Sequence, residues 1–239
     1  MPKQPVHRLR SRPKGPWLMT QTWKDVLFAH WPLPPRTLQT KIPEPLEIDT
    51  YDGQAWIGIV PFNIVHLRAR FLPPMPFAHA FPEVNVRTYV TFNGQPGVYF
   101  FSLDAEHRLA VLTARKLFHL PYFYSDIKVQ RKKGGIHYRS HRPDAMLEAA
   151  YEPSSTVFTA EKDSLDAWLT ERYRLYTTHK NKLYALDIHH HPWALQRAEA
   201  IFTNTTLAAS LSLHLPDTKP LLHYAKRQKV FFWPLYRSN

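Results

Sequence analysis

Short turn signals between pairs of strand-like segments constrain the fold of this chain more than any other feature. Asp52-Gly53 lies between LEIDTY and QAWIGIVPF, and Asn93-Gly94 lies between VRTYVTF and VYFFSL. Such dipeptides with apolar flanks are the strongest local signals for a β-hairpin, because both residues tolerate the backbone of a tight turn. In the second half, Gly134 separates DIKVQR from IHYRSH, and Asn181 separates YRLYTT from KLYALDIHHH. The pattern predicts four antiparallel hairpins.

The remaining segments add two strands and a few short helices. The runs DVLFAHW (25–31) and KVFFWPLY (229–236) are rich in aromatic residues, which favours strands. Helices are predicted over 35–41, over 105–118, from a cap at Asp163 or Ser164, and within 204–211. The proline-rich stretch 68–82 is typical of a stiff loop. Together these segments predict an α+β fold, a large, mostly antiparallel β-sheet or open barrel with a few short helices.

Length and composition fit one domain behind a tail. The chain has 239 residues, of which 44% are hydrophobic, enough for one substantial core. Residues 1–18 combine prolines and scattered charges without periodicity, so we expect a flexible basic tail followed by a single domain over 19–239. The absence of cysteine excludes disulfides and cysteine nucleophiles and gives no sign of an oxidising compartment. We expect a cytoplasmic protein.

The positive charge is concentrated in two places. Of the formal net charge of +12, five positive charges lie in residues 1–18, which contain no acid, so the remaining chain carries 12 − 5 = +7. A second basic cluster, Lys128 with 131–133, fits the solvated tip of a hairpin. No apolar run approaches the roughly 20 residues of a membrane span. A membrane is therefore not an expected partner, nucleic acid is a weaker hypothesis than a small-molecule ligand, and a homo-oligomer is left open.

A row of polar residues lies on one face of a predicted strand. Because side chains alternate along a strand, Glu83, Asn85 and Arg87 share one face and Val84 and Val86 share the other. The polar face either meets water, as in many antiparallel sheets, or lines a cavity. The surrounding aromatic residues favour a cavity, in which a buried carboxylate and guanidinium would each need a partner.

Two further polar residues lie at the end of the helix predicted over 105–118. Arg115 could bind a ligand carboxylate through its bidentate fork, and His119 could titrate near neutral pH. The alternative is structural, with Arg115 in an ion pair and His119 closing the helix end.

The triplet His189, His190 and His191 is the obvious candidate for a metal site. In a strand, His189 and His191 would share a face, but no third ligand has a diagnostic spacing, so we expect no metal. We expect the rings to lie at a strand end above Trp193. The common sequence signatures of nucleotide-binding loops, serine hydrolases and zinc proteases are absent, and we expect no cofactor.

Long phrases of this sequence resemble the YqjF-like bacterial family, a widely distributed family of unknown function. The matching phrases are TWKDVLFAHWPLPP (22–35), LEIDTYDGQAWIGIVPF (46–62), FPEVNVRTYV (81–90), GVYFFSLDA (97–105), LPYFYSD (120–126), SLDAWLTERYRLYT (164–177), IHHHPW (188–193) and PLLHYAKR (220–227). They span nearly everything after Thr20. The resemblance implies the fold of acetoacetate decarboxylase, a mostly antiparallel β structure that encloses a small-molecule pocket.

The decarboxylase carries a pattern similar to GREIWGYPKK, in which the lysine after the proline forms a Schiff base. The segment TARKLFHLPYF resembles it, with Arg115 at the arginine, Phe118 at the tryptophan and Pro121 at the proline. Tyr122 then stands at the lysine position, and a phenol cannot form an iminium with a ketone. The resemblance therefore implies a decarboxylase fold without decarboxylation through a Schiff base.

The sequence leaves three hypotheses. The first is a pocket for a small carboxylate or carbonyl compound, lined by some of Glu83, Asn85, Arg87, Arg115, His119 and Tyr122. The second is a non-catalytic binding or regulatory protein that keeps the fold. The third and weakest is a basic protein that binds nucleic acid or acidic partners through the +7 body and the tail.

Overall fold

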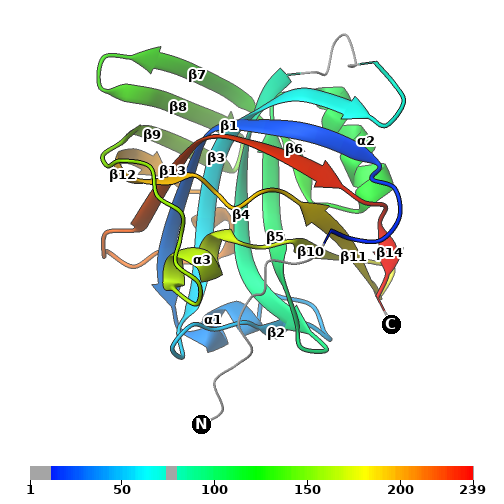
Figure 1. The fold of residues 1–239 in the computed structure, drawn as a ribbon. Coiled ribbons are helices and arrows are strands. Elements are labelled where there is room, and N and C mark those ends of the chain that lie inside the picture. The colour runs from blue at the N-terminus through cyan, green and yellow to red at the C-terminus, as the bar shows by residue number, and fades with distance from the viewer. Residues whose placement is uncertain (1–11, 74–79, 239) are drawn as a thin grey trace.

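The computed structural model describes residues 12–73 and 80–238 (Figure 1). Expectations for residues 1–11 and for the middle of the 68–82 loop lie outside the described residues. No helix in the described part is long and apolar enough to cross a membrane.

Strands make up most of the described structure. The first half contains β1 (Met19–Leu33), β2 (Glu47–Ile48), β3 (Ala55–Ala69), β4 (Ala80–Phe92), β5 (Gln95–Ala105), β6 (Tyr122–Tyr124) and β7 (Asp126–Lys132). The second half contains β8 (Gly135–Arg142), β9 (Ala145–Pro153), β10 (Arg174–His179), β11 (Lys182–His189), β12 (Leu195–Thr205), β13 (Leu221–Phe232) and β14 (Tyr236–Arg237). The helices are α1 (Pro35–Gln39), α2 (Arg108–Phe118), α3 (Leu165–Thr170) and a single 3-10 turn, η1 (Ala209–Leu211).

Seven strands form a closed ring. Their order is β11-β10-β5-β4-β3-β1-β13, and β13 pairs back to β11 through Ile188 opposite Phe232. The pairings are antiparallel except for β10 with β5, and the short β6 also lies parallel to β5. Because the ring closes, each of its strands has one face inside and one face outside.

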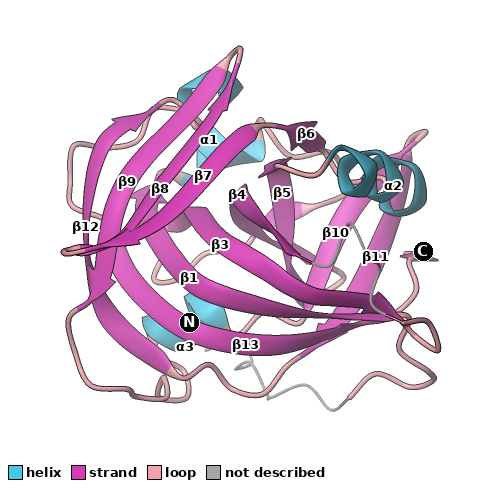
Figure 2. Cartoon of the chain, turned by 90° about the horizontal axis from the view of Figure 1, so that it is seen from above, coloured by secondary structure: helices cyan, strands magenta, loops and turns pink. Residues whose placement is uncertain are grey.

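A second layer covers one outer side of the ring. Strands β12, β9, β8 and β7 follow β13 in the pairing order and fold across β1 and β3, as Figure 2 shows. The core between the layers includes Leu27 and Ile57 from the ring and Tyr138 and Leu147 from the second layer, all almost completely buried. Burial of this kind contributes roughly 25 cal/mol per Å² of apolar area, so it fixes which face of each ring strand points outward.

Strand β4 shows the consequence for the polar row. Val84 and Val86 belong to the core between the layers. The alternation of side chains therefore turns Glu83, Asn85 and Arg87 to the inside of the ring, where all three are buried.

The fold class predicted from the sequence is confirmed, and three of the four hairpins form. The turns at Asn93-Gly94, Gly134 and Asn181 join β4 to β5, β7 to β8 and β10 to β11. The hairpin expected at Asp52-Gly53 is wrong, because both edges of β3 are occupied by β1 and β4. The preceding segment pairs with β4 instead, and the turn keeps a single bridge between Tyr51 and Gln54.

Other differences are local. The helices over 35–41, 105–118 and after Ser164 are present, whereas 204–211 forms only the turn η1. Strands β9 and β12 were not predicted, and strand structure reaches into both ends of the loop expected over 68–82.

The segment 12–18 is not a free tail. Trp17 packs edge-on against Phe231, and Trp233 donates a hydrogen bond to the carbonyl of Gly15 at 3.0 Å. This part of the expected 1–18 tail therefore lies against β13.

Candidate functional site

The inside of the seven-strand ring contains a cavity of about 180 Å³, here called the central cavity. Every strand of the ring contributes to its wall, together with α2 and β6. Its apolar wall includes Trp23, Val26, Phe28, Val60, Phe62, Val98, Phe100, Leu103, Leu186, Ile188 and Phe232. Its ionisable residues are Glu83, Arg87, Tyr122, Arg172, Arg174 and His190. A concave, mostly apolar site with a few convergent polar groups is the usual form of a ligand pocket.

Glu83 and Tyr122 form a hydrogen-bonded pair in this wall. The Tyr122 hydroxyl donates to Oε2 of Glu83 at 2.9 Å. Burial raises the pKa of Glu83 to about 8, although the Tyr122 hydrogen bond partly opposes this, and burial raises the pKa of Tyr122 well above its usual value. Both groups are therefore neutral at pH 7. A protonated carboxyl has an O–H that can donate, so the pair can present a hydrogen-bond donor to a carbonyl oxygen.

Arg87 is a buried cation without a carboxylate partner among the described residues. Its Nη2 donates to the Tyr89 hydroxyl at 3.3 Å and to the Leu169 carbonyl at 3.2 Å, and its guanidinium lies over the ring of Phe28. The Tyr89 hydroxyl also contacts Nε2 of His30 at 2.7 Å. Burial lowers the pKa of His30 well below its usual value, and the charge on Arg87 lowers it further. Nε of Arg87 is buried and has no hydrogen-bond partner in the described structure.

Arg172 brings a second guanidinium to the same region. Its Nη1 binds Asp49 at 2.6 Å, its Nε donates to the Trp168 carbonyl at 2.7 Å, and its Nη2 is buried without a partner in the described part of the chain. Burial lowers the pKa of Arg172, Asp49 opposes this, and the positive charge on Arg87 adds to the lowering. The two guanidiniums are thus near enough to interact.

The ionisable groups of the cavity carry an excess positive charge. Arg172 is balanced by Asp49, and Arg174 is balanced by Asp187 at 2.7 Å. Glu83 is neutral at pH 7, and burial lowers the pKa of His190 to about 4, so this ring is neutral as well. Arg87 therefore leaves about one positive charge uncompensated by the described residues. An unpaired buried charge is destabilising by several kcal/mol, and an anionic ligand would remove that penalty.

Further polar atoms in the wall lack partners within the described structure. They are Oδ1 of Asn85 and Nε1 of Trp193, and both residues are at least nine-tenths buried. Together with Nε of Arg87 and Nη2 of Arg172, these atoms make three N–H donors and one acceptor in the wall that have no partner among the described residues. Buried polar groups are normally hydrogen-bonded, so these four atoms are candidates for contact with a ligand.

The sequence-predicted residues fall into two groups. Glu83, Asn85, Arg87 and Tyr122 line the central cavity. Arg115 does not, because it lies on the exposed side of α2. His119 also lies elsewhere, since its ring stacks on His179 at 3.9 Å and its carbonyl accepts a hydrogen bond from Thr177.

The histidine triplet occupies the end of β11. The His190 ring lies 4.6 Å from Tyr173 and 5.2 Å from Trp193, so it lies at a strand end beside Trp193 as expected. Within the described residues, no group of three or more side chains is arranged to hold a metal ion.

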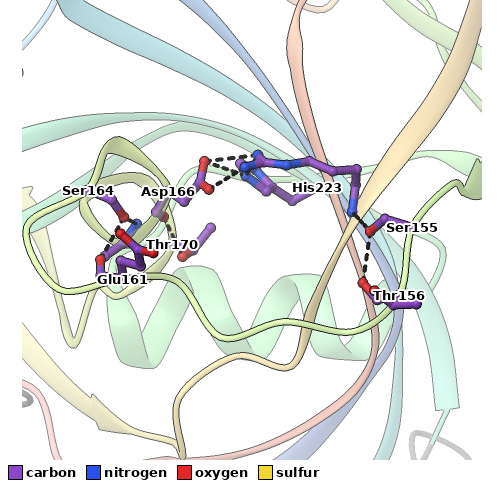
Figure 3. Close-up of polar contacts among 9 residues, drawn as sticks. Ser155, Thr156, Glu161, Ser164, Asp166, Thr170 and His223 are labelled. Carbon is purple, nitrogen blue, oxygen red and sulfur yellow. Dashed lines mark hydrogen bonds and ion pairs between the residues drawn. The ribbon is translucent and has the colours of Figure 1, made fainter.

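A second polar cluster joins α3 to β12 and β13. Asp166 binds Nε2 of His223 at 2.8 Å and Nη2 of Arg197 at 2.6 Å, and these contacts hold the pKa of Asp166 well below its usual range. Figure 3 shows Asp166 and His223 facing each other, with Ser155 pointing to Thr156. The Ser155 hydroxyl is thus engaged away from His223. The cluster anchors α3, whose Leu169 carbonyl binds Arg87.

Sequence reasoning missed Arg172 and Trp193 as cavity residues. Both lie in irregular segments, after α3 and after β11, where no periodicity indicates which way a side chain points. The one available signal was the position of Arg172 between aromatic residues, and its guanidinium does lie over the Trp168 ring at 4.2 Å.

Comparison with known proteins places this chain in a family. Residues 20–229 match the model of DUF2071, an uncharacterized conserved protein family. The chain belongs to the DUF2071 family. It is 60% identical over 228 residues to the uncharacterized protein YqjF of Bacillus subtilis (strain 168), with 94% of each chain covered. The YqjF-like resemblance seen in the sequence is therefore confirmed.

Solved structures similar to this DUF2071 member share the acetoacetate decarboxylase-like fold. The enduracididine biosynthesis enzyme MppR complexed with pyruvate has a TM-score of 0.66, with 93% of this chain and 91% of that chain covered. An acetoacetate decarboxylase-like enzyme from Sphingomonas wittichii RW1 has a TM-score of 0.65, with 94% of each chain covered. An acetoacetate decarboxylase from Legionella pneumophila has a TM-score of 0.64, with 97% of this chain and 94% of that chain covered. All three are 13% identical to this chain, so the likeness establishes the fold alone.

Proposed function

We propose that this protein binds a small monocarboxylate, or a related carbonyl compound, in the central cavity. The observation that carries the proposal is Arg87, a buried guanidinium that lines the cavity and has no carboxylate partner among the described residues. A guanidinium recognises a carboxylate through charge-assisted N–H···O bonds, and Nε of Arg87 has no hydrogen-bond partner in the described structure. Nη2 of Arg172 likewise has no hydrogen-bond partner among the described residues, and we propose it as a second donor to the anion.

The Glu83–Tyr122 pair complements this anion site. Glu83 lies four residues from Arg87 on β4, roughly 13 Å along an extended strand. A ligand long enough to span this separation, with its carboxylate at Arg87, can direct a carbonyl or hydroxyl group toward Glu83 and Tyr122. The similar structures support this assignment, because one is described with bound pyruvate and others are named for acetoacetate.

The proposal concerns binding alone. A site of this kind is compatible with an enzyme and with a regulatory protein. We also propose that no Schiff base forms, because Tyr122 stands at the position of the decarboxylase lysine in the sequence resemblance. None of the described residues that line the cavity is a lysine, which supports this view.

The test is the binding of monocarboxylates to the wild type, Arg87→Met and Arg115→Met, measured by calorimetry and by thermal shift. The two variants remove the same charge, one from the cavity and one from the surface of α2. We expect Arg87→Met to lose at least tenfold in affinity, of the order found when a buried charge-assisted hydrogen bond is removed, and Arg115→Met to bind as the wild type does. Arg87→Lys should retain part of the affinity because it keeps the charge but not the fork.

Two results would overturn the proposal. One is the absence of binding by every monocarboxylate in the panel. The other is equal binding by the wild type and a folded Arg87→Met variant.

A further inference from the structure

The wall between the two polar ends of the central cavity is almost entirely apolar. Phe28, Phe62, Phe100 and Phe232 line it from four different strands of the ring. The groups that can hydrogen-bond belong to the β4 row, to Tyr122, to the segment from Thr170 to Arg174 and to the residues that follow β11, with Gln21 of β1 and Thr113 of α2 as the remaining polar members of the wall. A ligand that reaches only Arg87 would therefore leave most of this apolar wall without contacts.

The volume of the cavity indicates how large the apolar part of the ligand is. An apolar cavity of about 150 Å³ stays free of water and accepts benzene. The central cavity, with about 180 Å³, is of this size. Burying apolar ligand surface contributes roughly 25 cal/mol per Å², whereas a small hydrophilic acid would gain only its polar contacts. The cavity is thus suited to a ring or a branched alkyl group.

The charges of the cavity limit the ligand to one carboxylate. Arg87 supplies about one uncompensated positive charge, whereas Arg172 and Arg174 are already paired. At the other end, Glu83 is neutral only because burial raises its pKa to about 8. A second carboxylate placed there would be a buried charge without a cation, which is strongly unfavourable.

The cavity approaches the surface beside α2. Leu109 and Thr113 of α2 line the cavity and are exposed, with 63% of the surface of Leu109 accessible. Leu112 and Leu117, on the same helix, are also exposed. Of these exposed leucines, Leu109 is the one that an apolar ligand inside the cavity can contact.

From the wall, the volume and the charges we infer that the ligand is a monocarboxylate with an apolar body of about the size of a benzene ring, and that short hydrophilic acids are poor ligands. This inference rests on the proposed function, because it assumes that Arg87 holds the carboxylate. It adds that contacts with the phenylalanine wall, rather than with the anion site, determine which monocarboxylates bind tightly.

The experiment compares matched acids that share a carboxylate and differ in the body. Acetate is paired with phenylacetate, pyruvate with phenylpyruvate, and succinate with hexanoate, and affinities for the wild type are measured by calorimetry. A single methylene in an apolar pocket is worth about tenfold or more, so we expect the apolar member of each pair to bind at least tenfold more tightly. Quenching of tryptophan fluorescence is a second readout, because Trp23 and Trp193 line the cavity.

A cavity-filling variant locates the apolar body. Val98 lines the cavity and is 5% exposed, so Val98→Phe should weaken phenylacetate by at least tenfold and change acetate little. Val157→Phe is the matched control, because Val157 is 62% exposed and outside the cavity wall. If Val98→Phe does not fold, the comparison of acids on the wild type still decides.

The outcomes separate the two proposals. If acetate or pyruvate binds as tightly as its phenyl partner, the inference on the apolar body is wrong and the carboxylate site stands. If no acid of the panel binds, the carboxylate site itself is wrong. If the phenyl acids bind but Val98→Phe leaves their affinity unchanged, the apolar body does not lie in the central cavity.

Discussion

At the scale of single residues, Glu83 and Arg87 show how one strand places a neutral carboxyl and a charged guanidinium in the same apolar cavity. Both are buried on the inner face of β4. Glu83 avoids the penalty of a buried charge by holding its proton, whereas a guanidinium cannot lose its charge in a protein. The strand therefore presents a neutral donor at one point and a fixed cation at the other.

The raised pKa of Glu83 makes a prediction about stability and pH. The pKa is about 8 in the folded state and about 4.3 in the unfolded chain, so the folded state holds the proton more tightly. This stabilising contribution is complete below the unfolded value and is lost as the pH rises through about 8, by at most about 1.4 kcal/mol per pH unit. We expect Glu83→Gln to remove this slope.

The measurement is urea unfolding of the wild type and Glu83→Gln between pH 5 and pH 9. The histidines titrate in both proteins, so the difference between their free energies of unfolding reports the titration of Glu83. Glu161→Gln, at an exposed position, is the control and should follow the wild type. Parallel curves for the wild type and Glu83→Gln over this range would show that Glu83 is ionised in the folded protein.

At the scale of elements, α3 connects the second polar cluster to the cavity. Asp166 in its first turn binds His223 of β13 and Arg197 of β12, and Leu169 near its end accepts the hydrogen bond of Arg87. The helix has only six residues and would not be stable alone. Its position, and with it the orientation of Arg87, therefore depends on these anchors.

We expect Asp166→Asn to lower the free energy of unfolding at pH 7 by about 1 to 2 kcal/mol, because a partly exposed charged hydrogen-bond network is lost. The contacts hold the folded pKa of Asp166 below its unfolded value of about 3.9, so its contribution is present above that pH and is lost as the pH falls through the folded pKa. Urea unfolding at pH 7 and pH 3 should show a smaller difference between the two proteins at pH 3.

Asp163→Asn is the matched control for that substitution. Asp163 lies just before α3, is exposed and has a positive φ of 68°, a conformation that asparagine tolerates. An equal loss of stability in both variants would contradict an anchoring role for Asp166.

The same elements show what the sequence could predict. Turn chemistry and alternation are local, so the hairpin at Asn93-Gly94 and the shared face of Glu83, Asn85 and Arg87 were predictable before any tertiary structure was known. The partner of a strand is not local, which is why the Asp52-Gly53 signal failed once β3 had two other neighbours.

Helix α2 illustrates a second limit. Leu109, Leu112 and Leu117 share a helical face in the sequence, but all three are exposed, and of these only Leu109 also lines the cavity, beside Ala110, Ala114 and Phe118. The position of Arg115 could not be derived for the same reason. Which face a helix presents depends on how the ring closes beneath it.

At the scale of the whole molecule, this DUF2071 protein has the same fold as several enzymes, but a common fold does not imply a common reaction. The similar structures cover more than nine-tenths of the chain at 13% identity, so what is shared is the fold. The fold supplies an enclosed space, and the side chains in it decide the reaction. In this chain those side chains include a carboxyl–phenol pair and a guanidinium that has no carboxylate partner among the described residues.

The side chains of the cavity wall predict the outcome of a covalent trapping experiment. A Schiff base forms when a lysine amine adds to a ketone with loss of water, and borohydride reduces the resulting iminium to a stable secondary amine. Because no lysine is among the described residues of the cavity wall, we expect the intact mass of the chain to be unchanged after incubation with acetoacetate and borohydride. An acetoacetate decarboxylase treated in parallel should gain the adduct. A stoichiometric adduct on this chain, mapped by peptide mass to one lysine, would place an amine at the cavity and would make Schiff-base chemistry its mechanism.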